Sequence, residues 1–210
     1  MSITTGDTIM QFQTETGATA MANLPAAKTP STAHVLANAI AFKLVWAAAI
    51  LGAANLSPWL GVWAAAAVLT GHLFAVPNKH QELRLVLLTA LIGFSTDSLF
   101  AATGMLQYTS GQLASWLAPV WIFGLWIGFG TTLNVAFRWL QNRWTLATIL
   151  GAVSGPLSYL AGAKMGAVAF PDTTLALISL SATWSVLLPS LLALASKFGS
   201  TAASREVAHV

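Results

Sequence analysis

Cysteine is absent from this 210-residue chain. A chain without cysteine forms no disulfide, offers no thiolate to a metal ion and has no cysteine nucleophile. Three kinds of functional or structural site are therefore excluded before any pattern in the sequence is considered.

Charge is also scarce, because only 7% of the residues are charged while 56% are hydrophobic and the mean hydropathy is +0.72. Soluble domains have roughly 25% charged residues. The net charge of +3 comes from scattered Lys and Arg. Scattered basic residues favour a role in membrane topology over nucleic-acid binding. We expect an integral membrane protein with no nucleic-acid partner.

Groups that usually carry catalysis are missing from the apolar stretches. No two carboxylates fall within them, and the four histidines are dispersed, at His34, His72, His80 and His209. A metal-assisted phosphotransfer site or a two-acid glycosidase site needs paired carboxylates. A helical metal site needs histidines four residues apart. We expect no metal and no cofactor, and the sequence favours a protein that is not an enzyme.

What the chain does have is six apolar runs, at 34–54, 58–76, 85–103, 116–137, 144–165 and 174–195. Each is close to the ~20 residues that a membrane-spanning helix requires. The sequence predicts an all-α fold, a polytopic bundle of about six transmembrane helices over residues 33–196. A disordered N-terminal tail (1–32) and a short C-terminal tail (197–210) are expected to flank it.

Basic residues predict the orientation, since Lys and Arg in short loops mark the cytoplasmic side of a membrane. They occur in the N-terminal tail, the second and fourth loops and the C-terminus, at Lys28, Lys79, Arg84, Arg138, Arg143, Lys197 and Arg205. The other loops have only Lys164. Both termini are predicted to be cytoplasmic.

Asp97 is the only charged residue between Leu85 and Thr103. A central Asp costs about 2.5 to 3.5 kcal/mol on insertion, and an intramembrane acid is by default a functional-site hypothesis. Counting ~1.5 Å per residue brings Lys43 to a similar depth. We expect a buried polar site of Asp97, Lys43 and Tyr159. Lys43 is the favoured partner of the acid, Tyr159 and Lys164 are the alternatives, and a Lys43 that reaches the headgroups instead stays open.

A second polar layer is predicted near the cytoplasmic surface. The same depth count brings Asn38, His72, Asn134 and Arg138 to one level. Ordinary interhelical hydrogen bonds and a binding site both remain open there.

Glycines recur on one face of two of the apolar runs. They are Gly124 and Gly128 in the fourth run and Gly151, Gly155 and Gly162 in the fifth. Small residues at such spacings let helix backbones approach closely in a membrane. We expect these glycines to be helix-packing positions, and a packing seam of this kind can also line a site.

Four segments carry a family resemblance: LGAANLSPWLG (51–61), TDSL (96–99), APVWIFGLWIGFGTTLNVAFRWL (118–140) and GPLSYLAGAKMGAV (155–168). Together they resemble a family of bacterial inner-membrane proteins known only as a domain of unknown function, over about residues 39–194. The resemblance implies a multi-pass protein of the bacterial inner membrane, encoded near enzymes that modify membrane fatty acids. It implies no catalytic residues.

The leading hypothesis is a non-enzymatic accessory in membrane-lipid (fatty-acid) modification. Its partners would be membrane lipids and another membrane protein or lipid-modifying enzyme. The alternative is a small transporter or carrier that uses Asp97 and Lys43, and an intramembrane lipid-modifying enzyme is the third hypothesis.

Overall fold

The computed structural model describes residues 30–207, with side chains up to residue 198. Within them the fold is all-α, as predicted. The helices are α2 (Thr32–Ala54), α3 (Trp59–Ala75), α4 (Lys79–Ala102), α5 (Val120–Gly130), α6 (Trp144–Lys164) and α7 (Thr173–Val207), with a short 3-10 helix, η1 (Arg138–Leu140). Residues 1–29 of the predicted N-terminal tail (1–32) lie outside the described residues.

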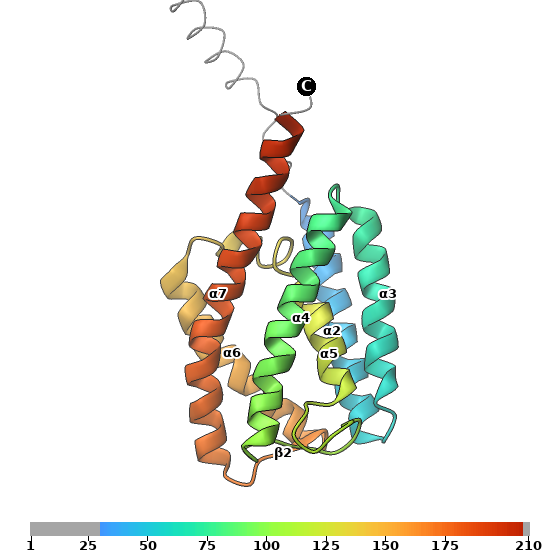
Figure 1. Ribbon diagram of the computed structural model, residues 1–210, viewed down its shortest axis with the longest axis vertical. Coiled ribbons are helices and arrows are strands. Elements are labelled where there is room, and N and C mark those ends of the chain that lie inside the picture. Colours follow the sequence, from blue (N-terminus) through green and yellow to red (C-terminus); the bar gives the residue numbers. More distant parts are fainter. Residues whose placement is uncertain (1–29, 208–210) are drawn as a thin grey trace, which may run out of the picture.

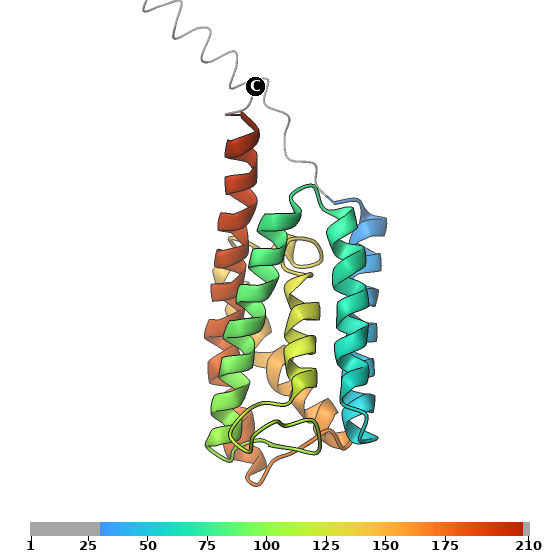
Figure 2. The same cartoon turned by 45° about the vertical axis from the view of Figure 1, so that its right-hand side comes forward.

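The helices form a bundle with α5 at its centre (Figure 1, Figure 2). Helices α2, α3 and α4 pack around α5, whereas α6 packs chiefly against α7, and α7 reaches the rest of the bundle through α4. The start of α2 and the end of α7 lie at the same end of the molecule (Figure 1). The bundle thus consists of a four-helix group and a helix pair set against it.

Among the described residues, four helices are long and apolar enough to cross a membrane: α2, α4, α6 and the part of α7 up to Phe198. Helix α3 has 17 residues, which is the lower limit for a transmembrane helix. Helix α7 continues to Val207, past the predicted end at residue 195. The count of six spans stays a prediction.

The helix predicted over 116–137 is much shorter in the structure. Helix α5 has 11 residues and ends at Gly130, and residues 131–137 form successive turns before η1. The hydroxyls of Thr131 and Thr132 donate back to the carbonyls of Gly128 and Phe129, at 2.8 and 2.6 Å. Threonine hydroxyls that bond carbonyls of the preceding turn compete with helix continuation.

Carbonyls released by this break receive donors from neighbouring elements. Asn38 Nδ2 of α2 donates to the carbonyl of Thr131 at 3.1 Å, and Gln141 Nε2 donates to that of Leu133 at 3.1 Å. Irregular backbone at membrane depth is tolerated only where the protein itself buries it and satisfies its polar groups.

A two-stranded antiparallel ladder, which the sequence did not predict, ties two loops together at one end of the bundle. Strand β1 (Gln107–Tyr108) follows α4 and pairs with β2 (Val168–Ala169), which follows α6. Thr109 Oγ1 also donates to the carbonyl of Gly166 at 2.6 Å. Side chains alternate along a strand, and Tyr108 is the one that points into the bundle, with 8% of its surface exposed.

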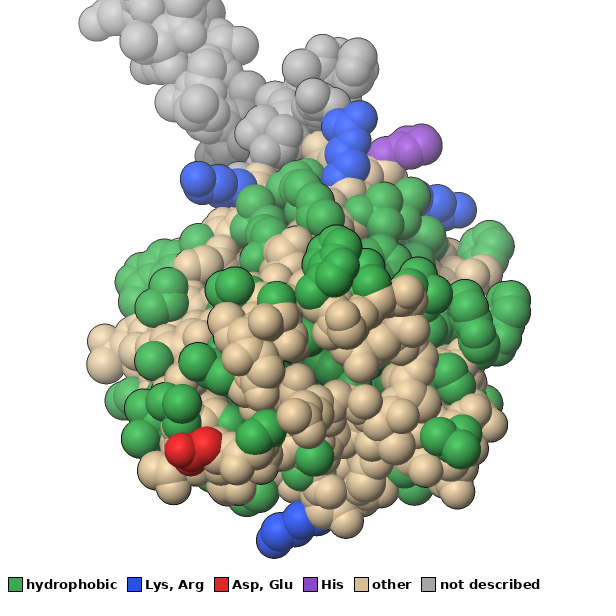
Figure 3. Space-filling view, turned by 60° about the horizontal axis from the view of Figure 1, so that its bottom comes forward, with side chains coloured by type: hydrophobic (Ala, Val, Ile, Leu, Met, Phe, Trp, Pro, Cys, Tyr) green, Lys and Arg blue, Asp and Glu red, His purple; other side chains and the backbone are tan. Residues whose placement is uncertain are grey.

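Charged side chains are unevenly distributed between the two ends. Figure 3 shows the β1–β2 end, where charged side chains are few and the surface is mostly apolar or uncharged. The start of α4, the α5–α6 connection and the C-terminal part of α7 lie at the opposite end, and they carry Lys79, Arg84, Arg138, Arg143 and Lys197. The cytoplasmic placement of this basic end remains a prediction.

The glycines lie where helices of this chain approach one another. A Cβ added at Gly151 would overlap the carbonyl oxygen of Trp184 on α7, and one at Gly155 would overlap the Trp184 ring. The other three meet α3 or α2 at the Cβ position: Gly124 (Val62 Cα at 3.1 Å), Gly128 (Val45 Cγ1 at 2.9 Å) and Gly162 (Ile50 Cδ1 at 3.2 Å).

We predict that Gly151→Ala destabilises the protein by about 1 to 3 kcal/mol, because the added methyl group forces α6 away from the α7 backbone. Gly71→Ala is the matched control, since a Cβ there meets nothing within 4 Å. Unfolding of both variants by denaturant in detergent measures the difference. Equal unfolding free energies would contradict the α6–α7 contact.

Candidate functional site

Asp97 is completely buried on α4 and accepts three hydrogen bonds. Tyr108 and Tyr159 both donate their hydroxyl protons to Oδ1, at 2.8 and 2.6 Å. Trp126 Nε1 donates to Oδ2 at 2.7 Å. The donors come from β1, α6 and α5, so this one carboxylate joins four elements of the fold.

These donors complement the two acceptor oxygens of the Asp97 side chain. A carboxylate only accepts hydrogen bonds, an indole N–H only donates, and a phenol is protonated at neutral pH. The chain has two tyrosines in all, and both donate to the same oxygen of Asp97. Hydrogen bonds to a charged acceptor are the strong ones, and they offset part of the cost of burying the group.

Gly93 makes room for the third donor. It precedes Asp97 by one helical turn and lies on the same face of α4. A Cβ at Gly93 would overlap the indole of Trp126. Only a glycine there lets the ring of Trp126 lie across α4 with its N–H on the carboxylate.

The predicted Lys43–Asp97 ion pair is not formed, which is a correction to the expected buried site. Tyr159 is a partner of Asp97, but Lys43 is exposed on α2 and Lys164 is exposed at the end of α6. The carboxylate is already surrounded by three donors. A lysine stem can follow apolar surface while its ammonium reaches a polar region.

A cavity of about 170 Å³ lies between the two helix groups, with α2 and α5 on one side and α6 and α7 on the other. Half of its lining is aromatic: Phe42, Trp46, Tyr108, Trp121, Trp126, Phe129, Phe137, Tyr159 and Trp184. All three donors to Asp97 are in this wall, while Asp97 itself lies behind it. Among the described residues of the lining, Lys43 is the only charged one.

The rings of the cavity wall pack against one another. Trp126 and Trp184 are stacked, with centroids 5.2 Å apart and an interplanar angle of 14°. Phe129 lies edge-on to both, at 5.5 and 5.7 Å. Trp46 Nε1 of α2 donates to Ser158 Oγ of α6 at 3.0 Å across the cavity. Such contacts hold the wall in a defined shape.

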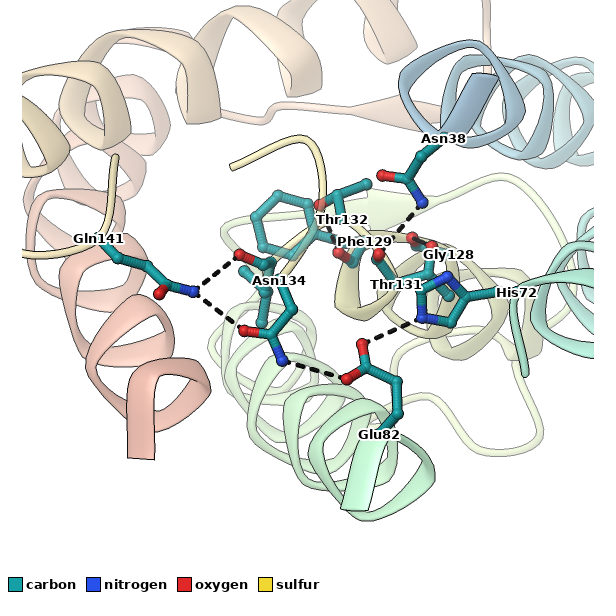
Figure 4. Close-up of polar contacts among 10 residues, drawn as sticks. Asn38, His72, Glu82, Gly128, Phe129, Thr131, Thr132, Asn134 and Gln141 are labelled. Carbon is teal, nitrogen blue, oxygen red and sulfur yellow. Dashed lines mark hydrogen bonds and ion pairs between the residues drawn. The ribbon is translucent and has the colours of Figure 1, made fainter. Parts of the chain in front are cut away.

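The second polar layer is centred on Glu82 (Figure 4). His72 Nε2 of α3 lies 3.0 Å from Glu82 Oε1, and Asn134 Nδ2 donates to Oε2 at 3.1 Å. Gln141 Nε2 donates in turn to Asn134 Oδ1 at 3.0 Å. Asn38 joins the same level through the carbonyl of Thr131.

Arg138 makes no hydrogen bond with the described residues of this layer, although it was expected there. Its placement beside Asn134 assumed a helix through residue 137. Helix α5 ends at Gly130, so the helical spacing between the two residues does not hold. The other expected members, Asn38, His72 and Asn134, do lie in the layer.

Glu82, Gln141, Tyr108 and Trp126 belong to these two clusters but were not singled out from the sequence. A signal for Glu82 was present, because the stripe that contains Gly93 and Asp97 continues back through Thr89 and Val86 to Glu82 at steps of three or four residues. Tyr108 and Trp126 reach Asp97 through the β ladder and the centre of the bundle, which the predicted spans did not reveal.

A family model described as "Protein of unknown function (DUF2878)" matches residues 35–190. The chain belongs to this family. The match confirms the resemblance to a family of unknown function, and both polar clusters of this DUF2878 protein lie within the matched residues. No curated protein sequence and no solved structure matches the chain.

We predict that Tyr108→Phe and Tyr159→Phe each lower the free energy of unfolding by about 1.5 to 3 kcal/mol, since each removes one donor from a buried charged acceptor. The double variant is expected to lose more than the sum, because Oδ1 then has no donor. Ser158→Ala removes a neutral hydrogen bond and should cost only about 0.5 to 1.5 kcal/mol. Denaturant unfolding measures all four variants, and similar losses for all single changes would contradict the charged acceptor.

We predict that His72→Leu or Glu82→Leu alone destabilises the protein by about 1 to 3 kcal/mol, because each removes one partner of a buried hydrogen bond. The double change should recover part of this loss, since both polar groups are then gone. Thermal unfolding of the three variants tests the pair. Additive losses would show that the two side chains are energetically independent.

Proposed function

We propose that this is a multi-pass protein of the bacterial inner membrane that binds a membrane lipid in the aromatic cavity. It would act as a non-enzymatic accessory to a lipid-modifying enzyme of the same membrane, which is the partner in this proposal. The observation that carries the proposal is the cavity between the four-helix group (α2 to α5) and the α6–α7 pair.

The surface around the cavity favours a lipid as its occupant. Lys43 on α2 and Ser154 on α6 are both cavity-lining and exposed, so the cavity reaches the outside between these two helices. Next to them, Leu44 and Val153 are 64% and 54% exposed. Exposed apolar side chains on helices of this length face hydrocarbon in a membrane, so a ligand would enter sideways from the lipid.

The state of the polar groups supports an accessory over an enzyme. Asp97 lies behind the cavity wall and is held by three donors, while His72 and Glu82 are paired with each other outside the lining. An acid–base catalyst must come within hydrogen-bond reach of the reacting atom. Each of these acid–base groups is thus already hydrogen-bonded within the protein and lies outside the cavity lining.

The carrier alternative draws on the same residues. It requires Asp97 to exchange its partners during transport, whereas its three hydrogen bonds come from three different elements of the fold. This arrangement favours a fixed carboxylate. We therefore rank the accessory role above the carrier.

We predict that Ser154→Trp abolishes lipid retention, because its side chain fills the opening of the cavity. Val153→Trp is the matched control, since it adds the same ring at the neighbouring position, which does not line the cavity. Mass spectrometry of lipids that co-purify in mild detergent, with the cellular fatty-acid profile, measures the effect. Equal lipid retention by both variants would overturn the proposal.

A further inference from the structure

The charges around the cavity define the headgroup of its ligand more narrowly than its apolar walls do. The lining has one cation, Lys43, at the exposed edge. One acidic side chain, Asp97, lies directly behind the inner wall, and three wall residues donate to it. A ligand that is only anionic would satisfy Lys43 alone, and one that is only cationic would meet repulsion at Lys43.

The inner wall has the properties of a site for an organic ammonium ion. The faces of Trp, Tyr and Phe attract cations, Trp most strongly, and aromatic cages are the known sites for quaternary ammonium groups. Here the indole of Trp126 and two phenols donate to a carboxylate. Donation to a carboxyl oxygen polarises these rings and makes their faces more electron-rich.

The size of the cavity fits such a group. Its volume is about 170 Å³, and apolar cavities of about 150 Å³ hold a benzene molecule. A trimethylammonium group or a primary ammonium group with its adjoining methylenes has a similar or smaller bulk.

A place for a hydrocarbon chain adjoins the cavity. A second hollow of about 350 Å³ shares Phe42, Lys43 and Phe137 with it and is otherwise lined by Val35, Leu36, Ala39, Ile40, Thr132 and Ala136. Lys43 therefore lies at the junction between an aromatic cavity and an apolar groove.

We propose that the cavity and groove bind a zwitterionic amphiphile, with its ammonium group among the aromatic rings, its anionic group at Lys43 and its chain in the groove. This inference rests on the proposed lipid binding and specifies the ligand class. A lipid with an amine-bearing phosphate headgroup has this chemistry.

Three probes with the same chain separate the charges: dodecylphosphocholine, dodecyltrimethylammonium and dodecyl phosphate. Each is titrated against the full-length protein in maltoside detergent, and native mass spectrometry counts the bound molecules. We expect one dodecylphosphocholine to bind at least tenfold more tightly than either probe with a single charge. Free phosphocholine, without a chain, should not bind.

Lys43→Gln and Trp184→Leu test which residues recognise the anionic and the ammonium group of the ligand. Lys43→Gln should weaken dodecylphosphocholine and dodecyl phosphate but not dodecyltrimethylammonium, and Lys43→Arg should restore binding. Lys164→Gln, an exposed lysine outside the lining, is the control. Trp184→Leu should weaken both ammonium probes about tenfold and leave dodecyl phosphate unchanged. Phe42→Leu on α2 repeats this test if Trp184→Leu unfolds at a lower temperature.

Two results would overturn the inference. Equal affinity of dodecyl phosphate and dodecylphosphocholine would mean that the site recognises an anion alone. Equal affinity of all three probes would mean that only the chain is recognised, and lipid binding would then survive without headgroup selectivity. Absence of both probe binding and co-purified lipid would instead reject the proposed function itself.

Discussion

The need to surround one buried carboxylate with hydrogen-bond donors organises most of this bundle. Asp97 lies in the middle of an apolar helix, where an unpaired charge is costly. Its three donors belong to β1, α5 and α6, so satisfying the acid also fixes where these elements meet α4. The β ladder also serves to surround Asp97, because it turns Tyr108 inward, toward the carboxylate. Gly93 serves the same purpose, because it leaves space for the indole of Trp126 to reach Asp97.

A second constraint of the membrane, the satisfaction of backbone groups, explains the second polar layer. Helix α5 ends half-way along the bundle, which would leave carbonyls without partners in hydrocarbon. Asn38 and Gln141 donate to carbonyls of the turns that follow. Asn134, within those turns, bridges Gln141 to Glu82. The layer is therefore built around the irregular segment, and its side chains stabilise the turns that follow α5.

The sequence was sufficient for features that depend on local composition and insufficient for those that depend on tertiary contacts. Apolar runs and the lone acid predicted the helices and the burial of Asp97, because both follow from the cost of polar groups in hydrocarbon. The depth count failed for Lys43, since depth along a helix says nothing about which way a side chain faces. The break after Gly130 also escaped prediction, because it depends on the hydrogen bonds that Thr131 and Asn38 make to backbone carbonyls in the folded protein. Tyrosine scarcity was an unused signal, as both tyrosines serve one acid.

Helix α4 links the two polar clusters, and this bears on what an occupied cavity would do. Glu82 and Asp97 lie on one buried face of α4, roughly 22 Å apart at ~1.5 Å per residue. One end of α4 is held by His72 and Asn134, and the other by the aromatic donors that form the cavity wall. A ligand that pressed on Trp126 or Tyr159 would therefore act on α4 through Asp97. Because Tyr159 belongs to α6, and α6 packs chiefly on α7, the same carboxylate also couples such a ligand to the α6–α7 pair.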